Sequence, residues 1–236
     1  MARRRSALER AQATARKRRR QWMLMTAAAA VIAVAVMIVL GGVLRDNGDG
    51  DGSGVERTSQ RAGRVLGEQT AGVVLTMWED FQCPFCKKAN DSVVARIVQD
   101  YVNTGKVQLH FRHFTILGQE SVWAAEAAEC AAEQNRFWDY EEELFNRQRG
   151  ENVGTFKKDK LKDAAAAIGL DTDSFNTCLD TDRYKDDVQK ELAEGKKLGV
   201  DSTPSFILEG RLLRPEVWGD YSAFAAALDN ALKVGR

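Results

Sequence analysis

The sequence predicts a single N-terminal transmembrane helix followed by an α/β domain with a helical insert. Three observations carry this prediction. An uncharged apolar run covers residues 22–44, strand and helix patterns alternate from residue 73, and residues 118–199 show only helical periodicity. The order expected over residues 73–236 is therefore strand, helix, strand, helical insert, strand, strand, helix.

The N-terminal segment carries the signals of a membrane anchor. Residues 1–21 hold nine Arg or Lys and one Glu, and the rest of the chain holds 25 basic and 33 acidic residues. Residues 22–44 would span about 35 Å as a helix, enough for a hydrocarbon core of roughly 30 Å. Positive charge before this run and little after it predict a cytoplasmic tail and an extracytoplasmic domain. The alternative is a cleaved signal peptide, but the apolar run is long for one and no clear Ala-x-Ala site follows.

Residues 45–72 are expected to be a flexible linker, because Asp alternates with Gly at its start and no core can form there. The aspartates would repel phosphate, so this Gly-rich run is not a nucleotide-binding loop. The basic block adjoins an apolar run, which favours a topology signal over nucleic-acid binding. No flavin, haem or nucleotide signature is present, and no cofactor is expected.

A Cys-x-x-Cys motif, Cys83-Pro84-Phe85-Cys86, lies where the apolar run 73–78 gives way to helical periodicity over 84–101. This spacing places Cys83 near a helix N-terminus, where free N–H groups and the helix dipole stabilise a thiolate. Cys86 lies one turn later, within reach of a disulfide. Pro84 suits the first helical turn because its missing N–H is not needed there.

The remaining elements follow from periodicity and turn residues. Residues 106–114 alternate as a second strand. The insert is expected to contain helices that start near Gly118 and cover 137–149, 157–168, a stretch capped by Asp171 or Thr172, and 184–198. Its first helix should bury Trp123, Ala127, Cys130 and Ala131 and expose Glu126, Glu129 and Glu133. Residues 203–208 and 211–213 form an expected hairpin, and a last helix starts near Pro215.

Four stretches resemble the DsbA-like thiol–disulfide oxidoreductases, which have a thioredoxin fold with an inserted helical domain. The resemblance covers about residues 70–234 and rests on residues 78–86, 111–114, 121–128 and 202–206. The family usually has proline where Thr115 stands. The resemblance implies that Pro204 is cis and faces the Cys-x-x-Cys, and that Thr203 offers its backbone to an extended substrate. The alternative is a trans proline that starts a strand.

Four further side chains have more than one possible role. Glu79 or Asp80 could exchange the proton of the Cys86 thiol or could simply be a solvated strand end, and alternation does not say which of them points inward. His110 and His113 could complete a zinc site with the two cysteines, but residues three apart on a strand point to opposite faces.

Cys130 and Cys178 could be buried, inert thiols or a structural disulfide. Two observations favour the disulfide. The predicted compartment is oxidising, and two cysteines, an even number, remain once the Cys-x-x-Cys pair is set aside.

These observations together predict an extracytoplasmic disulfide oxidase. Client thiols of exported proteins would attack Cys83, and the resemblance implies re-oxidation by a quinone-linked membrane protein of the DsbB or vitamin-K-epoxide-reductase type. The alternatives are a reductase, an isomerase, or a non-catalytic binding or metal-delivery module. Isomerases of this kind carry a dimerisation domain, and residues 45–72 leave no room for one, which counts against the isomerase. The protein is expected to be a monomer. Gln82 and Phe85 stand where reductases usually have Trp and Pro.

Overall fold

The structure is a computed structural model that describes residues 61–234. The expected tail (1–21), transmembrane helix (22–44) and most of the linker lie outside these residues. Within residues 61–234, no helix is both long and apolar enough to cross a membrane.

A six-stranded mixed sheet of order β1-β2-β4-β3-β5-β6 is the framework of the domain. Its two central strands are parallel, with Leu75 paired to Leu109 and Glu79 paired to His113. The next two strands form an antiparallel hairpin at the edge. These four strands are β3 (Val73–Glu79), β4 (Val107–His113), β5 (Ser205–Leu208) and β6 (Arg211–Leu212). The predicted strands at 73–78, 106–114, 203–208 and 211–213 are thus confirmed.

The linker prediction is wrong at its C-terminal end. Strands β1 (Arg61–Ala62) and β2 (Val65–Leu66) form a hairpin whose second strand pairs with β4. Leu66 is fully buried there. A strand of two residues is too short to show an alternating pattern of polar and apolar residues, so the sequence did not predict these two strands.

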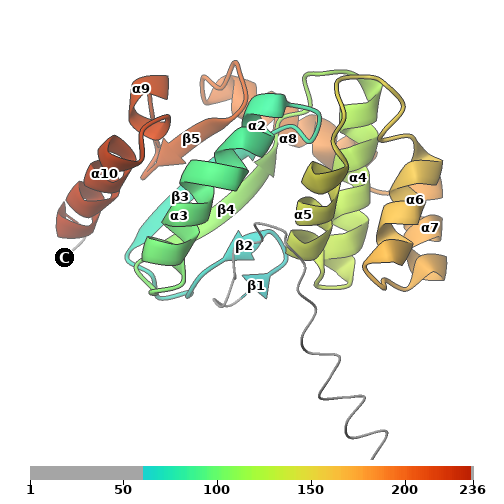
Figure 1. The fold of residues 1–236 in the computed structure, drawn as a ribbon, viewed down its shortest axis with the longest axis horizontal. Coiled ribbons are helices and arrows are strands. Elements are labelled where there is room, and N and C mark those ends of the chain that lie inside the picture. Colours follow the sequence, from blue (N-terminus) through green and yellow to red (C-terminus); the bar gives the residue numbers. More distant parts are fainter. Residues whose placement is uncertain (1–60, 235–236) are drawn as a thin grey trace, which may run out of the picture. The chain divides into compact units, whose positions relative to one another are not determined.

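The helix after the Cys-x-x-Cys runs without a break from Pro84 to Val102, as predicted over 84–101. Its successive parts are α2 (Pro84–Ala89), η2 (Asn90–Val94), α3 (Ala95–Ile97) and η3 (Val98–Val102), the η parts being π-helical. Figure 1 shows α2 and α3 in front of strands β3 and β4 and α8 behind the sheet.

The insert contains the five predicted helices: α4 (Gln119–Glu133), α5 (Phe137–Arg147), α6 (Lys158–Ala167), α7 (Thr172–Asp180) and α8 (Lys185–Lys197). Asp171 caps α7, because its carboxylate accepts from the Ser174 N–H at 2.9 Å. One prediction fails: Glu126 is buried at 1% exposure, whereas Glu129 is half-buried and Glu133 is exposed. The charges that act on Glu126 belong to Lys158, Asp182 and Lys185, which lie near the ends of later helices.

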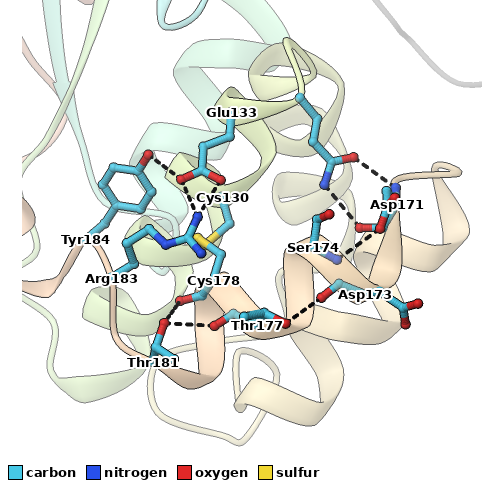
Figure 2. A network of polar contacts seen from close by, with 11 residues as sticks. Cys130, Glu133, Asp171, Asp173, Ser174, Thr177, Cys178, Thr181, Arg183 and Tyr184 are labelled. Atoms are coloured by element: carbon cyan, nitrogen blue, oxygen red, sulfur yellow. Dashed lines mark hydrogen bonds and ion pairs between the residues drawn. A yellow bond between two sulfur atoms is a disulfide. The ribbon is translucent and has the colours of Figure 1, made fainter.

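A disulfide joins α4 to α7 through Cys130 and Cys178, which lie 48 residues apart and are each about 1% exposed. Figure 2 shows it beside an ion pair in which Arg183 binds Glu133, with the Tyr184 hydroxyl donating to the same carboxylate at 2.7 Å. The insert is therefore cross-linked within itself, away from the Cys-x-x-Cys helix.

Apolar residues fill both faces of the sheet. The larger core lies under α2, α3, α10 and the insert, and a smaller one contains Trp78, Phe114, Val200 and Ile207 beneath α8. Helix α8 approaches closely because Gly195 has no side chain: a Cβ there would lie 2.8 Å from the Phe114 ring.

The predicted last helix is two helices, α9 (Pro215–Trp218) and α10 (Tyr221–Val234). The break lies at Gly219-Asp220, where the Asp220 carboxylate accepts from the Ala223 N–H at 2.9 Å and so starts a new helix. Phe224 and Leu228 of α10 are fully buried and face the core.

Candidate active site

The Cys-x-x-Cys lies at the carboxyl end of β3 and opens α2. Cys83 is the N-cap residue, Pro84 is in the first turn, and both cysteines are free thiols. Cys83 is 4% exposed and Cys86 is fully buried, whereas the Phe85 ring between them is 67% exposed. Only the first sulfur therefore lies near the surface.

The loop before β5 faces the first sulfur. The Thr203–Pro204 peptide bond is cis, and the Cys83 thiol donates to the Thr203 carbonyl at 3.3 Å across 120 residues of sequence. The four residues that the resemblance assigns to the reaction, Cys83, Cys86, Thr203 and Pro204, thus come from two segments that meet at one point.

The two thiols differ in acidity. The pKa of Cys83 is lowered from 9.0 to about 6, against the opposing effect of burial. The largest cause is a hydrogen bond from the Cys86 thiol, and further hydrogen bonds come from the Thr203 side chain and the N–H groups of Cys86 and Phe85. Burial, the hydrogen bond to Cys83 and the negative charge of Glu79 raise the pKa of Cys86 well above its usual range. One thiolate and one buried thiol are the stable reduced form at neutral pH.

The structure distinguishes the two neighbouring carboxylates. Glu79, at 1% exposure, acts electrostatically on Cys86 and accepts two hydrogen bonds from the Asn90 amide at 2.9 and 3.1 Å. Asp80 instead holds loops together: it accepts from the N–H groups of Gln82, Ile116 and Leu117 and from the Ser121 hydroxyl. Burial raises the pKa of Asp80 even so. Neither residue is a solvated strand end.

Comparison with known proteins agrees with this geometry. A family profile described as Thioredoxin matches residues 59–230. The chain belongs to the thioredoxin family. It is 28% identical over 205 residues to the probable disulfide bond formation protein D of Bacillus cereus, covering 84% of this chain and 92% of that one. It is 25% identical over 172 residues to the Bacillus subtilis disulfide bond formation protein D, covering 72% of this chain and 77% of that one.

Solved structures show the same fold. Oxidised BdbD from Bacillus subtilis superposes with a TM-score of 0.67 at 24% identity, over 74% of this chain and 97% of that one. This likeness supports the fold, and the curated relatives make the thioredoxin-family chain a thiol–disulfide oxidoreductase, and thus an enzyme.

Several residues of the site were not predicted, and most come from the insert. The Gln82 amide binds the Ser121 hydroxyl at 2.9 Å and the Leu117 carbonyl at 3.1 Å, and its carbonyl accepts from the Asn152 N–H at 2.6 Å. Gln148 donates to the carbonyls of Phe81 and Cys83. Gln148 and Asn152 lie far from the Cys-x-x-Cys in sequence and no motif marks them, so only the fold brings them to Cys83 and Gln82.

The zinc alternative does not fit the positions of the histidines. Along β4 burial alternates, so that His113 is buried while His110 is half-buried on the other face, as alternation predicted. The His110 Nε2 lies 2.7 Å from the Gln108 side-chain oxygen.

The ligand atoms of His113, Glu129 and Glu191 lie within 4.8 Å of one another. Arg64 already binds both carboxylates, at 3.0 and 2.6 Å, and Arg112 also binds Glu191. Because two guanidinium groups neutralise the two carboxylates, the cluster is an ion-pair network that joins the β1–β2 turn and β4 to α4 and α8.

Proposed function

We propose that this oxidoreductase is a net disulfide oxidase for exported proteins. The observation that carries the proposal is the unequal pair of thiols, one held as a thiolate at a helix N-terminus and the other buried. Stabilising the thiolate stabilises the reduced protein, and this makes the disulfide form a stronger oxidant.

The exchange follows from the exposure of the two sulfurs. In the oxidised protein, a client thiolate attacks the Cys83 sulfur, the Cys83–Cys86 bond breaks, and Cys86 leaves and takes up a proton. A second client thiolate then attacks the client sulfur of the mixed disulfide. The client gains a disulfide, Cys83 leaves as a stabilised thiolate, and the protein keeps the two electrons.

Glu79 is the carboxylate suited to exchange the Cys86 proton, because its charge acts directly on that thiol whereas Asp80 is occupied by four donors. Thr203 presents its carbonyl beside the Cys83 sulfur, where an extended client segment could pair with it. Pro84 and the exposed Phe85 border the same sulfur.

The location and partners of the enzyme are part of the proposal. The basic residues 1–21 and the apolar run 22–44 support a single membrane span, with a cytoplasmic N-terminus and the catalytic domain outside as a monomer. There, the two electrons taken from clients would pass to a membrane re-oxidant of the DsbB or vitamin-K-epoxide-reductase type. A membrane-impermeant protease added to spheroplasts should remove the domain and leave a small membrane-bound fragment. Free domain starting near residues 45–55 in the medium would show a cleaved signal instead.

Trapping of clients tests the reaction. Cys86→Ser should accumulate mixed disulfides between Cys83 and exported proteins, because no internal thiol resolves them, and Cys83→Ser should accumulate none. A protein that reduces insulin rapidly and oxidises no reduced test protein would be a reductase and would contradict the proposal.

A further inference from the structure

The side chain of Gln148, which follows the last residue of α5, reaches out of the insert to the peptide that carries the reactive sulfur. Its amide nitrogen lies 2.6 Å from the Phe81 carbonyl and 3.1 Å from the Cys83 carbonyl. An amide nitrogen has two hydrogens, so these two carbonyls use its full donor capacity. We propose that Gln148 is a positioning residue that fixes the Cys83 backbone and so holds the Cys83 sulfur against the N–H groups at the start of α2.

The hydrogen bonds at the Cys83 carbonyl support this role. That oxygen also accepts from the N–H groups of Cys86 at 3.1 Å and Lys87 at 3.3 Å. These two donors belong to α2 itself and move with it. Gln148 is different because it comes from the insert, and it ties Cys83, the N-cap residue of α2, to a part of the domain 65 residues further along the chain.

Three consecutive residues, 81–83, are held by hydrogen bonds from the insert, two of them by Gln148. Gln148 holds the carbonyls of Phe81 and Cys83, and the side chain of Gln82 between them is anchored to Asn152 and Ser121. Phe81 and Gln82 are almost completely buried. The peptide leading to the sulfur is therefore held from the insert side at every residue, and Gln148 is the contact nearest to Cys83.

The position of the sulfur matters because its thiolate is stabilised by donors of fixed direction. The N–H groups of Cys86 and Phe85 and the Cys86 thiol all favour the charged form of Cys83. A small rotation of the Cys83 backbone would move the sulfur away from them. The positive end of the Gln148 amide also points toward this residue, and its field favours the thiolate in the same direction.

Gln148→Met tests the proposal, since methionine has similar length but no donor. A rise of one pKa unit lowers the thiolate-to-thiol ratio at a fixed pH tenfold. We expect the pKa of Cys83 in the full-length reduced protein, followed by thiolate absorbance at 240 nm, to rise by about 0.5–1 unit. Alkylation of Cys83 at pH 5 should then be about three- to tenfold slower, and the disulfide should become less oxidising against glutathione.

Gln134→Met is the matched control. Gln134 also follows the last residue of its helix, α4, and its amide also bridges to a distant backbone, binding the N–H and carbonyl of Asp171 at 2.9 and 3.1 Å. Both of these hydrogen bonds go to Asp171 in the insert and neither goes to residues 81–86. Both variants should lower the melting temperature, but only Gln148→Met should change the acidity of Cys83.

A second variant separates chemistry from packing. Gln148→Glu keeps the shape but presents only acceptors and a negative charge, so the pKa of Cys83 should rise further than in Gln148→Met. An unchanged pKa in both Gln148 variants, or an equal rise in Gln134→Met, would overturn the proposal. Exchange with client thiols would be intact in either case, so failure here leaves the oxidase proposal standing.

Discussion

The hydrogen bond between the two thiols is the largest single cause of the acidity of Cys83, and replacing Cys86 tests it directly. The total lowering, from 9.0 to about 6, corresponds to about 4 kcal/mol. A hydrogen bond to a charged group contributes about 1.5–3 kcal/mol, or about 1–2 pKa units. In Cys86→Ala the pKa of Cys83 should therefore rise to about 7–8, whereas Cys86→Ser keeps a donor and should leave it close to 6.

The assay is the pH dependence of iodoacetamide alkylation in each single-thiol variant, with Cys130–Cys178 intact. Cys83 is then the one reactive sulfur among the described residues. At pH 6 the Ser variant should react several-fold faster than the Ala variant, and the rates should converge above about pH 9. Midpoints that agree within a few tenths of a unit would refute the assignment and point to the helix N-terminus and Thr203 as the dominant causes.

Two further predictions concern the insert. The double variant Cys130→Ala/Cys178→Ala should lose about 4 kcal/mol of unfolding free energy, because the disulfide closes a loop of 48 residues in the unfolded chain. Urea denaturation measures this loss, and the pKa of Cys83 should not change. An unchanged urea midpoint would show that the disulfide does not stabilise the fold. Burial and the charge of Asp182 raise the pKa of Glu126 to about 7, against the opposing charges of Lys158 and Lys185. Folded protein then binds this proton more tightly than unfolded protein, so stability should fall as pH rises from about 4.5 to about 7. Glu126→Gln should remove this loss of stability, so it should raise the melting temperature at pH 8 and change it little at pH 4.5. An equal change of melting temperature at the two pH values would contradict the raised pKa of Glu126.

The sequence allowed prediction of most of the fold because each long element carries its own period or cap. The strand at Val107–His113 alternates in burial as its residues alternate in polarity, and Asp171 caps α7 as its position suggested. The errors fall where local pattern is weak: the two-residue strands at 61–66, the break at Gly219, and Glu126, an acidic residue buried near charges on later helices.

Some residues of the active site could likewise be predicted from the sequence and others could not. The Cys-x-x-Cys and the Thr203-Pro204 pair are contiguous motifs, and it was the family resemblance, not their spacing, that implied that they meet, as the structure shows. The choice between Glu79 and Asp80 could not be made from alternation, because both side chains are buried and they differ only in their partners. Gln82 lies within the motif stretch, but its contacts with the insert were not predicted, and Gln148 could not be found at all, since an amide that binds backbone carbonyls leaves no pattern in sequence.

The reduction potential of the Cys83–Cys86 couple, measured at pH 7 against glutathione, tests the oxidase proposal most directly. With a pKa of about 6, Cys83 is mostly thiolate at pH 7, and relative to a thiol of pKa 9.0 this favours the reduced form by about 1.4 kcal/mol, or about 30 mV. We predict a potential above the thioredoxin value of about −270 mV, toward that of DsbA at about −120 mV. A value at or below about −270 mV would contradict this prediction and identify the protein as a reductase.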